Sequence, residues 1–370
     1  MNDSYKLFFV CPIGLEEIQA DELNKWLQFF DLQNIKIEKL KGGVEVTSNN
    51  LDIIHIVKTI KTSTKVLLRI NEFKVRDFPK LYNKVKKFNW APYLYLNDNI
   101  EINVTLKKSR LIHSGRAKDS IEKGINEWIK ANPRKKISTD LPPQKIHFNI
   151  NQDVCLVSID LCGEPLYKRE NKNQGAIAPI RENLASALIL WSINKNTKTH
   201  DSMFIDPMCG SGTFIHEALN LNNANKTKSL SLDFMPLTKK IKPIEVKDQP
   251  EFFKSYLGID QNNFFNKSRS KDERIKFINM NYHDALEEIK ENSVIIFNPP
   301  YGKRLKIKGD LADFYQKIIK TLMKTRPLMI GLIHPQETII KLPRGNYKRE
   351  DLLFKNGGLS VRYSLWFKST

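Results

Sequence analysis

The 370-residue sequence predicts an α/β protein with a mostly parallel sheet in its C-terminal half and a smaller α+β region before it. From about residue 180 onward, short apolar strands alternate with helical segments, which is the pattern of parallel strands joined by helical crossovers. Before residue 165, alternating apolar positions occur in strand pairs separated by turn residues. The stretch 163–179 between the two regions is polar and punctuated by glycine and proline. We therefore place a domain boundary inside this stretch.

The first region is expected to contain two parts, residues 1–72 and residues 73–165. For residues 1–72 we expect strand 6–12, helix 14–30, hairpin 35–48 turning at Gly42-Gly43, helix 50–63 capped by Asn50 or Asn49, and strand 65–75. For residues 73–165 we expect a helix that starts at 77 and stops before Pro92, strand 99–111, basic helix 114–132 and two antiparallel strands within 144–163.

Residues 166–370 are expected to form the parallel-sheet domain. Its expected elements are helix 180–194, strand 202–207, helix 213–221, strand 255–260, helix 262–274, strands 275–281 and 293–300, helix 311–324, strand 328–333 and a hairpin over 347–367 turning at Asn356-Gly357-Gly358. A lysine-rich insertion, residues 222–253, interrupts the series and carries no recognisable pattern.

The amino-acid composition limits the classes of molecule that the protein is expected to bind. The formal net charge of +19 indicates a polyanion, either nucleic acid or an acidic membrane surface, unless it reflects only a lysine-rich proteome. The apolar runs are too short to span a bilayer, and the N-terminus lacks a signal peptide, so we expect a cytoplasmic protein that does not enter membranes. The four cysteines form no C-x-x-C pair, which favours reduced, buried thiols over a metal site or disulfides. Nothing in the sequence indicates an oligomeric state, and a monomer is the default.

The stretch FIDPMCGSGTF, residues 204–214, is the first candidate site. An acidic residue ends a strand, Gly210 and Gly212 allow a tight turn, and a helix follows immediately, so free N–H groups would face a ligand. The stretch lacks both the third glycine of the dinucleotide fingerprint and the lysine of a P-loop. The alternative is an ordinary glycine-rich turn between a strand and a helix.

Carboxylates recur where successive strands end. Asp206, Asp260 and Asp284 each follow an apolar strand. In open α/β sheets, ligands bind at the carboxyl edge of the strands, and an acidic residue after the second strand suits a ribose diol. Asp284 could accept a hydrogen bond from an exocyclic amine such as that of adenine. Each carboxylate alone is a weak signal, but three in succession predict a nucleoside-type site.

The stretch SVIIFNPPYGKRL, residues 293–305, is the most specific signal. Asn298 and the carbonyl of Pro299 offer two acceptors at a corner that Pro299 and Pro300 make rigid, and this arrangement can hold the two hydrogens of an –NH₂ group. Tyr301 could stack on a base. Lys303 and Arg304 could meet phosphates. The alternative is an ordinary proline-rich strand terminator.

In this order, DPMCGSGT, GID, DA and NPPYGKRL resemble S-adenosyl-L-methionine-dependent methyltransferases that act on amino nitrogens. PLYKR, APIRENLASALI, DFYQKI and FKNGGLSVRYSLWF further resemble bacterial large-subunit ribosomal RNA guanine-N2 methyltransferases. CPIGLEEIQADEL, GGVEV and SRLIHSG resemble the N-terminal part of that family, a ferredoxin-like region followed by a THUMP domain. The resemblance implies a Rossmann-like class I methyltransferase domain over 166–370, a THUMP RNA-binding domain over 73–165 and a ferredoxin-like region over 1–72.

The resemblance also implies site residues. The cofactor would lie against Asp206, Pro207, Cys209, Gly210, Gly212, Thr213, Asp260, Asp284 and Asn183, with no metal. The target guanine N2 would be positioned by Asn298, Pro299, Pro300 and Tyr301. RNA would contact Lys107, Lys108, Arg110, His113, Arg116, Lys118, Lys303 and Arg304.

The expected reaction is direct methyl transfer to the N2 amine of a guanosine in 23S ribosomal RNA. Some relatives carry a second methyltransferase module that this chain does not, which implies a single modification. Three alternatives remain open: a transfer RNA guanine-N2 enzyme, a DNA adenine-N6 enzyme, and a non-catalytic RNA-binding assembly factor. Cys209 lies in the cofactor turn rather than at the NPPY corner, so a nucleophilic role for this thiol is rejected.

Overall fold

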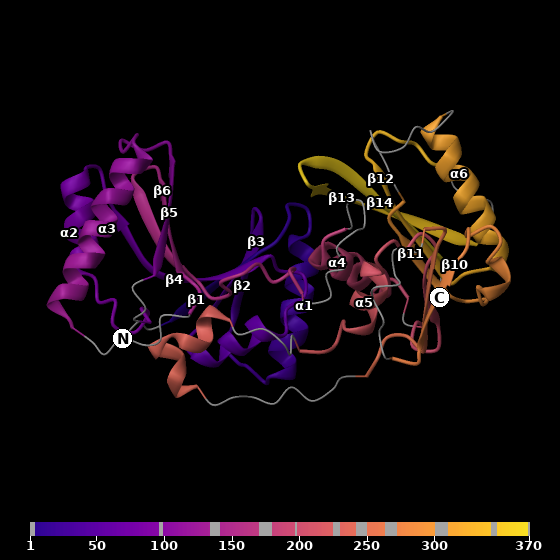
Figure 1. The fold of residues 1–370 in the computed structure, drawn as a ribbon, viewed down its shortest axis with the longest axis horizontal. Helices are drawn as coiled ribbons and strands as arrows, with labels where there is room; N and C mark the ends of the chain where they lie inside the picture. The colour runs from indigo at the N-terminus through magenta and orange to yellow at the C-terminus, as the bar shows by residue number, and fades with distance from the viewer. Residues whose placement is uncertain are drawn as a thin grey trace.

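The computed structural model describes residues 4–95, 99–133, 141–169, 180–196, 198–224, 230–241, 250–262, 272–299, 310–341 and 346–368. These residues form two seven-stranded sheets, one from each half of the chain (Figure 1). The first sheet and its helices lie at one end of the long axis, and the second sheet lies at the other. The predicted fold class, an α+β region followed by a Rossmann-like α/β region, is confirmed.

The N-terminal sheet is continuous across the expected boundary between residues 72 and 73. Its strand order is β2-β3-β1-β4-β7-β6-β5, and only the β5–β6 pair is parallel. The strands are β1 (Tyr5–Val10), β2 (Lys36–Leu40), β3 (Gly43–Ser48), β4 (Lys65–Lys74), β5 (Ile100–Lys107), β6 (Gln144–Asn151) and β7 (Val154–Asp160). Strand β4 pairs with β1 on one side and β7 on the other. The two N-terminal parts therefore share one sheet, and the boundary between them stays a prediction.

Helices α1 (Glu16–Phe29), α2 (Phe78–Lys87) and α3 (Ser114–Ala131) accompany this sheet. Asp77 caps α2 by accepting a hydrogen bond from the Lys80 N–H at 2.7 Å. Leu81 and Val85 are buried, and α2 packs closely on α3 because Gly124 has no side chain: a Cβ there would lie 3.0 Å from Val85.

The segment predicted as an α-helix over 50–63 is instead a 3-10 helix, η1 (Leu51–Lys58), followed by irregular chain. The predicted cap is confirmed, since the Asn50 side chain accepts from the Asp52 N–H. The helix does not continue because the Glu22 carboxylate accepts from the N–H groups of Lys61 and Thr62, at 2.7 and 3.0 Å. These backbone donors are therefore satisfied outside a helix.

The C-terminal sheet has the order β10-β9-β8-β11-β12-β14-β13. The first five strands are parallel, and the last two form an antiparallel hairpin, as predicted. The strands are β8 (Met203–Asp206), β9 (Ser255–Asp260), β10 (Ile275–Asn279), β11 (Val294–Phe297), β12 (Met329–Pro335), β13 (Tyr347–Asn356) and β14 (Leu359–Lys368). The chain order reverses direction between β8 and β11, which makes their carboxyl ends a topological switch point.

Helices α4 (Glu182–Ile193), α5 (Thr213–Leu219) and α6 (Leu311–Leu322) pack with the C-terminal sheet. The second half of the chain also contains short 3-10 helices, which are η2 (Ser231–Phe234), η3 (Pro236–Lys240), η5 (Leu286–Glu288) and η7 (Met323–Thr325). Helix α4 is buried on nearly all sides because it lies between the two halves (Figure 1). Cys11, Leu15 and Ile18 of the N-terminal region belong to the same apolar cluster as α4. The two halves therefore share core contacts.

The insertion over 222–253 has a structural role that its sequence did not indicate. One of its described stretches, 230–241, packs on the N-terminal core through Leu230, Leu232 and Met235. The Leu232 N–H donates to the Leu161 carbonyl at 3.0 Å, and the Leu237 N–H donates to the Pro92 carbonyl at 2.8 Å. The insertion therefore attaches the C-terminal domain to the N-terminal sheet.

Candidate functional site

The loop after β8 forms the predicted tight turn into α5. Gly210 and Gly212 have φ values of +51° and +79°, which lie in the left-handed region that favours glycine. The Asp206 side chain accepts from the Met208 N–H at 3.1 Å, and the Cys209 N–H donates to the Ile259 carbonyl at 2.9 Å. Pro207 is buried beside them, and Thr213 is the first residue of α5. The loop therefore lies across the ends of β8 and β9.

Asp206 and Asp260 lie at the ends of these neighbouring strands. The Asp260 carboxylate accepts from the Gly210 N–H at 2.9 Å and from the Asn262 N–H at 2.7 Å. Burial, reinforced by the negative charge of Asp260, raises the pKa of Asp206 well above its usual range. Burial also raises the pKa of the Cys209 thiol, which argues against a thiolate nucleophile.

Gly258 and Phe277 support the loop, and sequence reasoning did not assign them this role. A Cβ on Gly258 would lie 2.5 Å from the Phe277 ring and 3.1 Å from Cys209 Sγ. A Cβ on Gly212 would lie 3.0 Å from the same ring. Phe277 therefore fills the space that two glycines leave. A glycine inside an apolar strand was the available signal.

Asn298 directly follows β11, whose neighbours in the sheet are β8 and β12. Its Oδ1 atom is shielded from solvent and accepts no hydrogen bond from any described residue. Pro299, the next residue, is buried. An unpaired buried acceptor is unusual and indicates a missing donor. Pro300, Tyr301, Lys303 and Arg304 lie outside the described residues, so their predicted roles stay predictions.

Two further candidates have different surroundings. Asp284 is exposed and lies in a turn beyond β10, whose last residue is Asn279, so it does not stand directly at the strand end. Asn183, near the start of α4, is buried, and its amide lies 3.3 Å from the Thr62 carbonyl and 3.2 Å from Thr64 Oγ1. Asn183 thus contacts the N-terminal region with its amide nitrogen, while its Oδ1 atom accepts no bond from the described residues.

A cluster of buried polar side chains joins the two halves of the molecule next to Asn183. Arg169 forms an ion pair with Glu217 on α5 and donates to the Lys61 carbonyl at 2.8 Å. Ser186 on α4 donates to the Glu217 carboxylate at 2.5 Å. Burial lowers the pKa of Arg169 to about 10, which leaves the guanidinium charged at pH 7. This group connects the helix that begins at the glycine loop to the N-terminal region.

The six N-terminal residues proposed to bind RNA surround the connection between β5 and α3, and all six side chains are exposed. Arg110 lies 3.4 Å from the Asp153 carboxylate, and Lys118 lies 3.7 Å from Glu122. Lys107, Lys108, His113 and Arg116 complete the set. Their exposure is compatible with a basic surface, and their contact with RNA stays a prediction.

Across the described ranges, no group of three or more histidine, cysteine or acidic residues is arranged to hold a metal ion. The four cysteines all lie in the described ranges and are buried, as predicted. None of the described helices is both long and apolar enough to cross a membrane.

A five-stranded parallel run that reverses order at β8 and β11, with a glycine loop and two carboxylates at its switch point, is a Rossmann-like arrangement with a ligand-binding edge. Residues 169–341 match the RMKL-like methyltransferase domain family, and residues 75–160 match the THUMP domain family. A THUMP match followed by an RMKL-like methyltransferase-domain match is the domain order that the sequence resemblance implied.

The curated relatives of this chain are also named as RNA methyltransferases. A ribosomal RNA large subunit methyltransferase K/L from Buchnera aphidicola (subsp. Acyrthosiphon pisum) is 26% identical over 402 residues, covering 100% of this chain and 55% of that protein. The K/L protein of Syntrophotalea carbinolica is 28% identical over 222 residues, covering 59% of this chain and 30% of that protein. The chain thus spans about half the length of these K/L relatives, or less. YpsC of Bacillus subtilis, provisionally named an RNA methyltransferase, is 28% identical over 336 residues, covering 85% of this chain and 83% of YpsC.

Two solved structures share the fold over almost the whole chain. SMU.472, provisionally named a methyltransferase and solved in complex with SAH, matches with a TM-score of 0.76 at 22% identity, covering 100% of both chains. TrmN from Thermus thermophilus matches with a TM-score of 0.66 at 14% identity, covering 98% of this chain and 99% of TrmN. These likenesses support the arrangement of the N-terminal sheet and the methyltransferase domain.

Proposed function

We propose that this chain transfers a methyl group from S-adenosyl-L-methionine to the N2 amine of a guanosine in large-subunit (23S) ribosomal RNA. The observation that carries this proposal is the buried, unpaired Oδ1 of Asn298 at the switch point of a methyltransferase sheet. An acceptor in that position lacks a donor within the described chain, and a substrate amine supplies one.

The residues around the β8 loop fit the cofactor. The two Asp260 oxygens each accept one backbone N–H, and a carboxylate has about four acceptor sites, so capacity remains for a ribose hydroxyl. Gly210 and Gly212 let the backbone approach a ligand closely. SMU.472, which shares this fold, was solved with SAH. When bound, S-adenosyl-L-methionine supplies an activated methyl group.

The chain's own contribution is orientation. Asn298 Oδ1 and the Pro299 carbonyl accept the two N–H hydrogens of the target amine, which directs the nitrogen lone pair away from them. Because Pro299 restricts the backbone, the acceptors are positioned before the substrate binds. The target base leaves its stack to reach this corner, and Tyr301 is proposed to stack on it. Asn183, Pro207, Cys209, Thr213 and Asp284 are proposed to complete the cofactor site.

RNA is the proposed substrate because the K/L relatives are named as ribosomal RNA enzymes and YpsC as an RNA enzyme. The net charge of +19 and the THUMP domain agree with this choice. The same pair of acceptors would also hold the N6 amine of adenine. The choice of guanine therefore rests on the family resemblance, and the choice of ribosomal RNA rests on the relatives.

The test is the Asn298→Ala variant with unmethylated 23S ribosomal RNA. Loss of a preorganised polar group at a reacting centre lowers turnover about 10²- to 10³-fold. Affinities for S-adenosyl-L-methionine, measured by calorimetry, and for RNA, measured by filter binding, should stay close to those of the wild type. Unchanged turnover in this variant would refute the proposed role of Asn298.

A further inference from the structure

A basic pocket is lined mainly by residues of α2. Helix α2 lies at the opposite end of the molecule from the methyltransferase sheet (Figure 1). The volume of the pocket is about 390 Å³, which lies within the range of small-ligand sites. The residues that line it, called here the α2 pocket, are Asn71, Lys80, Asn83, Lys84, Lys87 and Phe88. None of them belongs to the six N-terminal residues considered above for RNA binding.

Helical spacing places these side chains together. Lys80, Lys84 and Lys87 recur at intervals of four and three residues, so they share one exposed face of α2, opposite the buried Leu81 and Val85. From the sheet, Asn71 joins this face. Asn71 directly follows a register shift in the pairing of β4 with β7. Such bulges redirect side chains and occur often beside functional sites.

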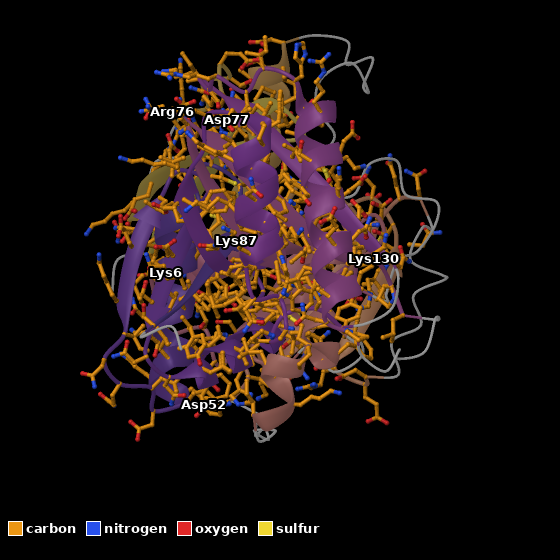
Figure 2. The ribbon with its side chains drawn as sticks, turned by 90° about the vertical axis from the view of Figure 1, so that its left-hand side faces the viewer. Lys6, Asp52, Arg76, Asp77, Lys87 and Lys130 are labelled. Carbon is orange, nitrogen blue, oxygen red and sulfur yellow. The ribbon has the colours of Figure 1, made fainter. Side chains whose placement is uncertain are left out.

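The charges in the α2 pocket are only partly neutralised. Lys80 lies 3.5 Å from the Asp77 carboxylate. Among the described residues, no carboxylate lies within ion-pair distance of Lys84 or Lys87. By contrast, the neighbouring Lys86 lies outside the pocket and is paired with Glu127 at 2.6 Å. Figure 2 shows Lys87 near the centre of the face that α2 presents. The pocket therefore offers two uncompensated cations to an anion.

Phe88 gives the pocket a fixed aromatic surface. Its ring stacks on Tyr93, with 5.8 Å between centroids and an interplanar angle of 12°, and meets Trp90 edge-on at 4.8 Å. Phe88 is only partly buried, and its remaining exposed surface lines the pocket. An aromatic ring, two amides and unpaired lysines are the side chains that hold a nucleotide: stacking for the base, amides for its edge and cations for phosphates.

We propose that the α2 pocket binds an unpaired nucleotide of the RNA substrate, with its base against Phe88, its base edge near Asn71 and Asn83, and its phosphates at Lys84 and Lys87. The inference rests on the proposed RNA substrate and deepens it. It assigns an anchoring site at the opposite end of the molecule from the methyl-transfer site. The RNA segment held there is distinct from the one that carries the target base.

The first test measures binding of the full chain to unmodified 23S ribosomal RNA transcribed in vitro. Loss of two single-strand phosphate contacts in the Lys84→Ala/Lys87→Ala variant should lower the slope of log K against log salt by about 1.4 and weaken affinity about 25-fold at 0.1 M salt. The matched control is Lys86→Ala on the same helix, which should change affinity no more than about twofold. Equal losses of binding free energy per lysine removed in the two variants would overturn the pocket and indicate general electrostatics.

Two further variants probe the base. Phe88→Ala should weaken RNA affinity about 5- to 150-fold through lost stacking. Asn83→Asp, at an exposed position that leaves packing unchanged, should also weaken it by repelling phosphate. All variants should bind S-adenosyl-L-methionine like the wild type, which confirms folding. If the Asn83→Asp variant and the Lys84→Ala/Lys87→Ala variant both bound RNA with the affinity of the wild type, the proposal would be overturned.

The second test maps contacts with 4-thiouridine-substituted RNA. Crosslinks are expected in the peptide spanning residues 78–88, and crosslinks confined to residues 107–118 would overturn the α2 pocket while preserving the RNA substrate. Failure of the wild type to bind RNA would overturn both. A competition experiment distinguishes a nucleotide site from a site for an acidic protein. Oligouridine should displace the bound RNA. Displacement by polyglutamate as effective as that by oligouridine would contradict a nucleotide site.

Discussion

The buried ion pair between Arg169 and Glu217 provides a sharp quantitative test of how the two halves are held together. Removing the guanidinium with Arg169→Met leaves the Glu217 carboxylate buried without its cation. The Glu217 side chain is 6% exposed and that of Arg169 is 16% exposed, so solvent compensates little. Breaking one side of such a pair costs about 3–5 kcal/mol of unfolding free energy. The same change removes the hydrogen bond to the Lys61 carbonyl in the N-terminal region.

A double-mutant cycle isolates the charge. Glu217→Gln keeps an acceptor for the Ser186 hydroxyl and removes the carboxylate charge. With both charges gone, no uncompensated ion remains, so Arg169→Met/Glu217→Gln should lose at least about 2 kcal/mol less than the sum of the single variants. The matched control is Lys168→Met, which breaks the exposed pair with Glu164 at 2.6 Å. That change should cost at most about 1 kcal/mol.

Urea unfolding of the wild type and the four variants, followed by tryptophan fluorescence, measures these differences. Hydrogen exchange at the 59–64 segment reports whether the junction opens before the rest of the chain, as expected for Arg169→Met. Strict additivity of the single variants, or a Lys168→Met loss as large as that of Arg169→Met, would refute the reasoning.

Two other predictions follow from packing and from a buried histidine. Gly258→Ala places a Cβ within 2.5 Å of Phe277. Calorimetry should therefore show weaker S-adenosyl-L-methionine binding, and denaturation should show a loss of about 1–3 kcal/mol in the free energy of unfolding. The control Gly115→Ala, whose Cβ would meet nothing within 4 Å, should leave both unchanged. A Gly258→Ala protein with unchanged stability and affinity would show that the loop tolerates the extra atom. Burial lowers the pKa of His334 to about 4, so its contribution is complete above the ordinary pKa near 6.5 and is lost as pH falls toward 4. Between pH 7.5 and pH 5 the wild type should lose about 2 kcal/mol that His334→Gln does not lose; parallel pH profiles in urea unfolding would contradict this assignment.

Local chemistry accounts for what the sequence predicted well. The turn at Gly210 and Gly212 and the hairpin at Gly357 and Gly358 adopt positive φ values, as their glycines require. The alternation of strands and helices predicted the parallel sheet, and Asp206 and Asp260 stand at its strand ends as expected. These features depend on a few neighbouring residues.

The remaining features depend on contacts between distant segments. The pairing of β4 with β7 merges two expected units into one sheet. Glu22 on α1 takes the backbone N–H groups that a helix over 50–63 would have used, so propensity alone favoured the wrong structure there. The contacts of the Asn183 amide nitrogen with Thr62 and Thr64 were likewise not predictable from the sequence, and the cofactor role of Asn183 stays a proposal. None of these partners is near its counterpart in sequence.

The identity of the methylated nucleoside tests the central claim most directly. The protein is incubated with tritiated S-adenosyl-L-methionine and total RNA from a strain that lacks the gene. The labelled RNA is separated by size, digested and chromatographed. The account predicts label in 23S ribosomal RNA as N2-methylguanosine, and none with Asn298→Ala. Label in transfer RNA, label recovered as N6-methyladenosine, or no transfer to any RNA would contradict it.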